Sequence, residues 1–304
     1  MQAAHSLSGK ALVATLGMAV LFGTSFVASK VALSAFSPTQ LVFARFAVAT
    51  LLFLALRPVM PNALVNAEQL KRLLVLALLE PGAYFFLESY GLQRTLASTA
   101  SVLIATIPVF VLLLEVVLLK AAVAFLDAVL IVLSLTGVGL LLSAKGEPAF
   151  GGTLVGNLLI LGAAFSAAVY TLVARNLMAS LDALTVTRWQ AIFAVVLYFP
   201  FAGAAWLKGQ PLPNTWQPWA AVLYLGVFCS FGAYALLNYA LSQARPSLVA
   251  AFSNLIPVVA TAVSLLVLGE RLVLQQLAGA ALTVGAIALL TLRHRQQPSP
   301  PTPG

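Results

Sequence analysis

Ten runs of apolar residues divide the chain, and each is close to the roughly 20 residues that a helix needs to cross a bilayer. The runs cover about 11–33, 39–57, 73–92, 96–118, 124–144, 154–174, 184–206, 218–241, 246–268 and 273–292. The runs are too long for barrel strands, and they do not alternate polar and apolar residues as such strands do. The pattern therefore predicts an all-α integral membrane protein with ten transmembrane helices joined by short connections.

The composition also indicates a protein surrounded by lipid. Apolar residues make up 62% of the 304 residues and charged residues only 8%, whereas a soluble domain carries roughly 25% charged residues. The net charge of +8 comes from basic residues scattered between the runs, so we expect it to set topology and not to bind nucleic acid. A single cysteine, Cys229, and two histidines outside the runs exclude a disulfide framework and make a metal site or catalytic triad improbable.

The distribution of Lys and Arg predicts the orientation in the membrane. If the N-terminus is cytoplasmic, nine basic residues near span ends lie inside and four lie outside, as the positive-inside rule requires. We therefore expect a multi-pass protein of the inner (plasma) membrane with both termini in the cytoplasm. Residues 1–10 would form the cytoplasmic N-terminus, the first run would be a retained helix and not a cleaved signal, and the proline-rich residues 293–304 would form a disordered tail.

The two halves of the chain, 11–144 and 154–292, resemble each other. YGLQRTLASTASVLIATIP (Tyr90 to Pro108) aligns without gaps with YALSQARPSLVAAFSNLIP (Tyr239 to Pro257) at an offset of 149. Because each half holds five spans, an odd number, the second half must enter the membrane from the opposite side. The sequence thus predicts two inverted five-helix repeats, a layout that alternating-access carriers use.

These features together resemble a known family. FGTSFVASK in the first span, Arg45 in the second and the paired Ile-Pro helices are similar to the EamA group of the drug/metabolite transporter superfamily, over about residues 11–292. The resemblance implies secondary transport, commonly export of amino acids or related metabolites. It also implies a central cavity lined by spans 1–4 and 6–9, with spans 5 and 10 peripheral. One departure is that Lys30 lacks a counterpart in the second half, where the matching residues read Ala168-Val169-Tyr170.

An acidic stripe in the third span is the strongest candidate for a binding site. Glu80, Tyr84 and Glu88 are spaced i, i+4 and i+8, which places them on one helix face, and Pro81 predicts a kink beside them. Ionisable groups at this depth are costly and are functional candidates by default. The carboxylates could bind a substrate ammonium group or carry a proton. A structural role is the alternative, with Glu88 paired to Lys30 and Glu80 buried in its protonated form.

Three basic residues inside the spans are candidates for gating or conformational roles. Lys30 could form a gate pair with Glu88, or its amine could reach the outer interface. Arg45 and Arg188 align between the halves, and we interpret both as structural anchors that cap helix carbonyls or meet lipid phosphates. Binding a substrate carboxylate and simple extension to the interface are the alternatives for both arginines.

Further polar residues and prolines complete the predicted site. Pro108 and Pro257 lie in the middle of paired spans and predict bends that act as hinges, or static kinks. Asn238, Tyr239 and Asn254 could line the second side of the cavity or bond to neighbouring helices, and the same alternatives apply to Tyr170 in span 6.

The absence of enzymatic motifs favours transport driven by a gradient. The chain contains no GxxxxGK[ST] phosphate loop, no HExxH and no GxSxG, so we expect no cofactor, no metal and no catalytic site. The leading hypothesis is a secondary carrier that exports amino acids or related small metabolites and that could be proton-coupled. A membrane-embedded flippase or enzyme acting on lipid-linked substrates is the alternative, and a passive channel a weaker one. We expect a monomer or a weak homodimer.

Overall fold

The computed structural model describes residues 8–60, 64–95, 100, 103–120, 124–143, 153–209, 212–268 and 274–296. The first half contains α1 (Gly9–Leu33), α2 (Pro38–Ala55), η1 (Arg57–Val59), α3 (Ala67–Ala77), η2 (Leu78–Ala83), α4 (Tyr84–Leu92), α6 (Ile107–Leu119) and α7 (Phe125–Ser143). The second half contains α8 (Leu154–Leu177), α9 (Ala183–Leu207), α10 (Trp216–Tyr224), η3 (Leu225–Ala233), α11 (Tyr234–Gln243), α12 (Pro246–Ala251), η4 (Phe252–Asn254), α13 (Leu255–Leu268) and α14 (Leu274–Gln296).

The all-helical membrane architecture predicted from the sequence is confirmed. Every regular element among the described residues is a helix, and five continuous segments have the length and apolar composition to cross a bilayer, the last of them Trp216–Gln243. The outer surface of these helices is apolar: Val13, Leu51, Leu154 and Val196 are all at least 65% exposed. A face of this kind needs lipid around it.

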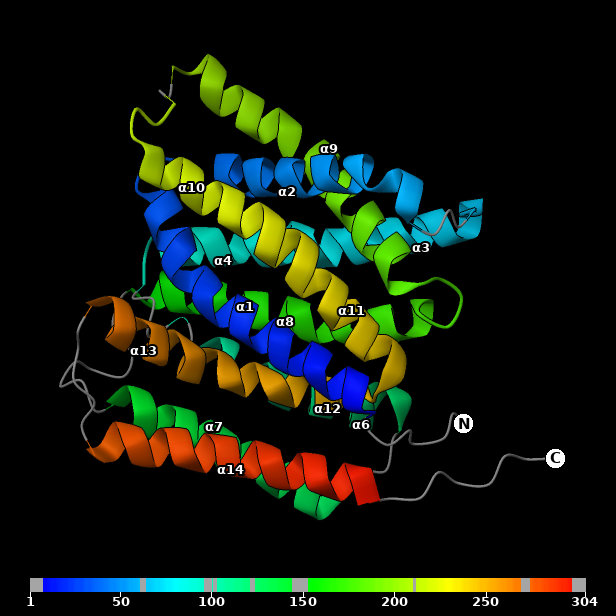
Figure 1. Cartoon of the computed structure of the whole chain (residues 1–304), viewed down its shortest axis with the longest axis vertical. Helices are drawn as coiled ribbons and strands as arrows, with labels where there is room; N and C mark the ends of the chain where they lie inside the picture. Colours follow the sequence, from blue (N-terminus) through cyan, green and yellow to red (C-terminus); the bar gives the residue numbers. More distant parts are fainter. Residues whose placement is uncertain are drawn as a thin grey trace.

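The two halves run through the bundle in opposite directions. Lys30 at the end of α1 contacts Thr95 and Thr153 at the start of α8 contacts Arg94, both in the segment that follows α4, so α1 and α8 are antiparallel. The start of α1 and the end of α14 lie on the same side of the molecule (Figure 1). The N-cap residues Ser8 and Thr153 open α1 and α8, and the N-cap residues Ser37 and Asp182 open α2 and α9. Both pairs are 145 positions apart, which gives a structural register for the inverted repeat.

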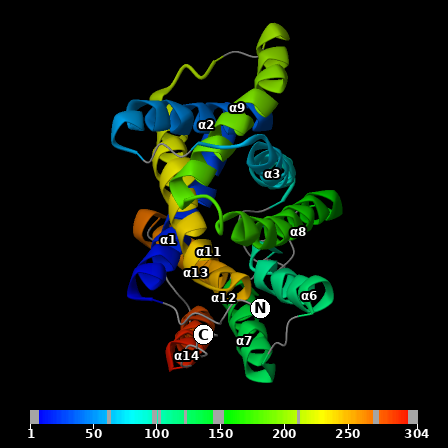
Figure 2. The same cartoon turned by 90° about the vertical axis from the view of Figure 1, so that its right-hand side faces the viewer.

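Helices α7 and α14, the fifth and tenth spans, pack against each other at one end of the long axis, while α2 and α9 lie at the other end (Figures 1 and 2). Gly137 of α7 makes the close approach possible. A Cβ atom at this position would lie 2.7 Å from the carbonyl oxygen of Gly279 and 2.5 Å from Thr283 Oγ1. The expectation that spans 5 and 10 are peripheral agrees with this arrangement.

In spans 3 and 8 the regular α-helix is interrupted by a π-helical segment at matching places. The π-helical segment η2 separates α3 from α4, and η3 separates α10 from α11. In η2 the backbone of Glu80 is extended (φ −148°, ψ 114°), and the Glu80–Pro81 peptide bond is cis. Each interruption ends in the same tripeptide, Gly-Ala-Tyr, at residues 82–84 and 232–234.

Spans 4 and 9 are interrupted just before their prolines. Pro108 lies in the first turn of α6, and Pro257 is the third residue of α13, directly after the 3₁₀ turn η4. We expected a bend in the middle of one helix, but the structure begins a new helix at each position. Proline lacks an N–H group, and the first turn of a helix has no partner for one.

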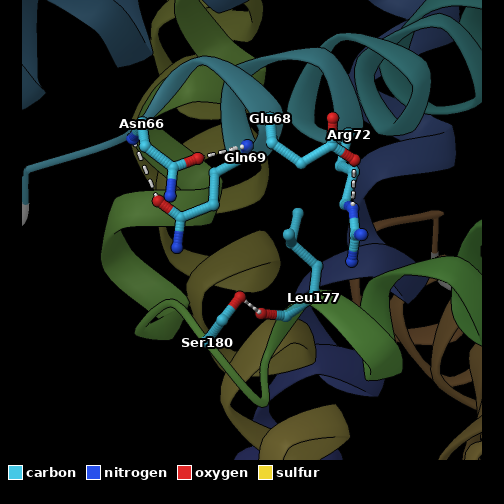
Figure 3. Close-up of polar contacts among 6 residues, drawn as sticks. All are labelled: Asn66, Glu68, Gln69, Arg72, Leu177 and Ser180. Atoms are coloured by element: carbon cyan, nitrogen blue, oxygen red, sulfur yellow. Dashed lines mark hydrogen bonds and ion pairs between the residues drawn. The ribbon is translucent and has the colours of Figure 1, made fainter.

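The helix ends at the side of the N-terminus carry ordinary capping contacts (Figure 3). Asn66 and Gln69 form a capping box at the start of α3, where the exposed pair Arg72–Glu68 also lies. Helix α14 continues to Gln296, so residues 293–296 are helical and not part of the predicted disordered tail. Residues 1–7 and 297–304 lie outside the described part of the chain.

Candidate functional site

A buried cavity lies between the two halves of the bundle. Four of its walls come from α1, η2–α4, α8 and α11, and the remainder comes from α2, the start of α6 and the segment α12–α13. Spans 5, 7 and 10 contribute none of its lining among the described residues. The space that water-sized molecules can reach inside it is about 50 Å³, enough for a few waters only. The cavity is therefore narrow in this conformation.

Arg45 lines this cavity, so its position fits the alternative of a substrate-carboxylate ligand as well as a structural role. It sits two turns into α2 and is only 2% exposed. Its Nε donates to Ser230 Oγ at 2.8 Å, and its Cζ lies 4.4 Å from the ring centroid of Phe85. These contacts hold the guanidinium against the cavity wall by a hydrogen bond and a cation–π interaction.

The acidic stripe faces the same cavity. Glu80, Tyr84 and Glu88 all line it, and both carboxylates are at most 5% exposed. Glu80 Oε1 accepts a hydrogen bond of 2.5 Å from the hydroxyl of Tyr234. The predicted stripe is therefore brought together, although Glu80 departs from helical geometry.

Side chains of the second half satisfy the broken backbone of span 3. The carbonyl of Leu79 accepts from Ser166 at 2.9 Å, that of Glu80 from Gln190 Nε2 at 2.9 Å, and that of Gly82 from the Tyr198 hydroxyl at 2.6 Å. Because a buried carbonyl without a partner is costly, these three contacts stabilise the interruption that carries Glu80.

Tyr170 and Asn238 lie behind the cavity wall and not in the cavity. The Tyr170 hydroxyl donates to Asn238 Oδ1 at 2.5 Å, and Asn238 Nδ2 donates to Gln190 Oε1 at 2.8 Å and to Thr187 at 2.9 Å. The network ends on Gln190, which donates to the Glu80 carbonyl. For both residues the structure matches the alternative of bonds to neighbouring helices: they support the wall and do not line the cavity.

Two other predicted lining residues serve helix packing. Tyr239 is half-buried against the apolar cluster around Tyr170, and Asn254 donates from Nδ2 to Ser134 Oγ of α7 at 2.5 Å. Neither lines the cavity. For both residues the structure matches the alternative of contact with a neighbouring helix.

Lys30 does not pair with Glu88. Its Nζ donates to the carbonyl oxygens of Leu92 at 2.6 Å and Thr95 at 3.2 Å. The second half also has a counterpart, contrary to expectation: Arg175 donates from Nη1 to the carbonyls of Leu241 at 3.0 Å and Ser242 at 2.9 Å. Lys30 and Arg175 are again 145 positions apart, the register set by the helix caps.

The same register shows that the counterpart of Arg45 is Gln190 and not Arg188. Arg45 of α2 bonds to the interruption of span 8, and Gln190 of α9 bonds to the interruption of span 3. Arg188 is half-buried and does not line the cavity. The two arginines are 143 positions apart, whereas the N-cap residues of α2 and α9 are 145 apart, so the arginines are not equivalent.

Sequence reasoning missed the aromatic part of the site. Tyr234 contacts Glu80 directly, and Phe22 and Phe85 pack edge-on or tilted around its ring. The repeated Gly-Ala-Tyr would have identified Tyr234 as the counterpart of Tyr84. The phenylalanines give no such signal, because apolar aromatic residues occur throughout the spans.

Comparisons with known proteins agree with this architecture. The model of the EamA-like transporter family matches residues 9–143 and again residues 154–292. An uncharacterized transporter of Archaeoglobus fulgidus is 31% identical over 91% of this chain and 96% of its own, and the uncharacterized transporter YcxC of Bacillus subtilis is 28% identical over 89% of both. A probable terminal-alkyne amino-acid exporter of Streptantibioticus cattleyicolor is 25% identical over 96% of this chain and 98% of its own.

A solved crystal structure shares the fold. It covers 94% of this chain and 98% of its own with a TM-score of 0.76, at 18% sequence identity. The two family matches together span nearly the whole chain. The structure has two inverted helical halves with a cavity between them. The chain belongs to the EamA-like transporter family and is a membrane transporter.

Proposed function

We propose that the protein is a secondary active transporter of the inner membrane that exports amino acids or closely related zwitterionic metabolites. The observation that carries the proposal is that Arg45, Glu80 and Glu88 share one buried cavity. A guanidinium binds a carboxylate through two parallel hydrogen bonds, and a carboxylate binds an ammonium group. The site thus offers a partner for each charged end of a zwitterion.

The rest of the cavity suits an apolar substrate body. All three charged lining residues come from the first half, and their counterparts in the second half, at Gln190, Ser230 and Asn238, are neutral. The remaining walls are mainly aromatic and aliphatic: Met18, Phe22, Phe26, Ile104, Ile107, Leu237, Val249 and Ile256. This favours substrates with a zwitterionic head and an apolar side chain, whose head binds to the first half.

The inverted repeat supports alternating access as the mechanism. Two halves of similar structure can exchange conformations and open the cavity to one side at a time. The narrow cavity must widen to take a metabolite, and the interruptions before Pro108 and Pro257 are where spans 4 and 9 can bend. Glu80 and Glu88 are the candidates for binding a coupling proton, because they are the ionisable carboxylates in the pathway.

Transport by purified protein in liposomes tests the proposal. We expect saturable uptake of labelled apolar amino acids that is stimulated by unlabelled substrate on the opposite side. Arg45→Gln and Glu80→Gln should lose at least about tenfold of this flux while the protein remains folded, since each loses a charge-assisted contact. Glu68→Gln, in the exposed pair with Arg72, is the matched control and should transport normally.

The same assay separates carrier from channel and tests the coupling proton. Flux that rises linearly with concentration would contradict a carrier. If Glu80 carries the proton, Glu80→Gln should abolish the response to a pH gradient, and an unchanged response would remove Glu80 from that role.

A further inference from the structure

Two cationic side chains occupy equivalent positions at opposite ends of the cavity. Lys30, in the last turn of α1, donates to the carbonyls of Leu92 and Thr95. Arg175, in the last turn of α8, donates to those of Leu241 and Ser242. In each case the acceptors lie at the end of the second part of an interrupted span. The last carbonyls of a helix lack intrahelical partners and carry partial negative charge, so they attract a cation.

Both contacts lie one helical turn beyond the cavity. Phe26 of α1 and Glu88 of α4 line it, and Lys30 and Leu92 follow them by four residues on the same helix faces.

At the other end the spacing is the same. Thr171 of α8 and Leu237 of α11 line the cavity, and Arg175 and Leu241 follow them by four residues. Each cation therefore joins two helix ends across one end of the cavity.

Further contacts at the end of the cavity near Lys30 join the start of α8 to the segment after α4. Thr95 Oγ1 and Asn157 Oδ1 are 2.6 Å apart, and the amide of Thr153 donates to the carbonyl of Arg94 at 2.9 Å. The start of α8 is thus attached to the same segment that Lys30 holds. Separation of α1 from α4 would break the Lys30 contact and leave the contacts of α8 in place.

We propose that Lys30 and Arg175 are a symmetry-related pair of gate latches, each of which holds one end of the cavity closed and is released when that end opens. Both are engaged in this structure, in which the cavity between them is narrow. With the orientation predicted from the basic residues, Lys30 controls the outer gate and Arg175 the inner gate. The inference rests on alternating access but requires no particular substrate.

Accessibility of the cavity to a thiol reagent tests the latches directly. The chain has one cysteine, so Cys229→Ala gives a cysteine-free background, and Ser25→Cys places a reporter on the cavity wall. Labelling by a charged, membrane-impermeant methanethiosulfonate is measured from each side, in right-side-out and inside-out vesicles. The reporter Ser253→Cys, which lines the cavity from η4, repeats the measurement at a second position.

The two latch variants should have opposite effects. Lys30→Met should raise the labelling rate from the face where α1 ends by roughly tenfold, the factor that loss of one charge-assisted hydrogen bond allows, and lower it from the other face. Arg175→Met should do the reverse. Lys30→Arg and Arg175→Lys keep the charge and should label as the parent does, as should Arg72→Met in the exposed pair.

A purely structural role would not separate the faces. If both variants raise labelling from both faces alike, or leave it unchanged, the latch assignment is wrong. Should Lys30→Met not fold, Lys30→Gln replaces it with the same expected direction. Labelling needs no substrate, so its result is independent of the amino-acid transport assay. If amino acids are not transported but the two variants still shift labelling in opposite directions, the proposed substrate is rejected and the latch assignment stands.

Discussion

Substitution of Gln190 by leucine tests how the interruption of span 3 is held. Gln190 is 1% exposed, and its Nε2 donates to the Glu80 carbonyl at 2.9 Å. Leucine has a similar size but no polar atoms, so the cavity wall keeps its volume and loses the hydrogen bond. The amide of Tyr84 donates to Leu79 and Pro81, so it does not replace Gln190 as a donor to Glu80.

The size of the effect follows from which groups lose their partner. The buried Glu80 carbonyl would lose its side-chain donor, and a buried carbonyl without a partner costs about 1–3 kcal/mol. Asn238 retains its bond to Thr187, and Tyr170 retains its bond to Asn238, so the remaining network contributes little to the loss. Interhelical hydrogen bonds in membrane proteins average roughly 0.6 kcal/mol, so we expect a loss near the lower end of this range, about 1 kcal/mol in the free energy of unfolding.

Reversible unfolding of the purified protein by dodecyl sulfate in mixed micelles measures this loss. Gln217→Leu is the matched control, because Gln217 is exposed at the start of α10; it should change the free energy of unfolding by less than about 0.5 kcal/mol. Gln190→Leu should also reduce transport, since the backbone that carries Glu80 would shift. An unfolding free energy equal to that of the parent would refute the reasoning that side chains of the second half support this interruption.

Three further substitutions address packing outside the cavity. Gly137→Val should separate α7 from α14 and cost about 2 kcal/mol or more, because the new side chain would overlap the backbone of α14; parental unfolding behaviour would contradict this. Asn254→Ala should cost about 1 kcal/mol by removing the bond to Ser134, measured in the same titration, and a gain in stability would refute it. Arg293→Met should cost about 0.5 kcal/mol, since its pair with Asp127 at 3.2 Å is partly exposed, and the difference should shrink at high salt; a salt-independent loss would argue against an ion pair.

The class of the protein and most of its helices follow from the amino-acid sequence alone. Lipid requires long apolar segments with internally satisfied backbones, so hydropathy alone located the spans, and five spans per half required the inversion. The acidic stripe was also predictable, because carboxylates inside an apolar span are rare and stand out. Its members Glu80, Tyr84 and Glu88 do line one cavity.

The partners of the polar residues were decided only by the tertiary structure. Arg45 bonds to Ser230, Gln190 to the carbonyl of Glu80, and Arg175 to the end of α11. These contacts join residues more than 60 positions apart, and several acceptors are backbone carbonyls, which look the same at every position of a sequence. Which carbonyl lacks a helical partner depends on where the backbone breaks, and that is fixed by how the two inverted halves pack together.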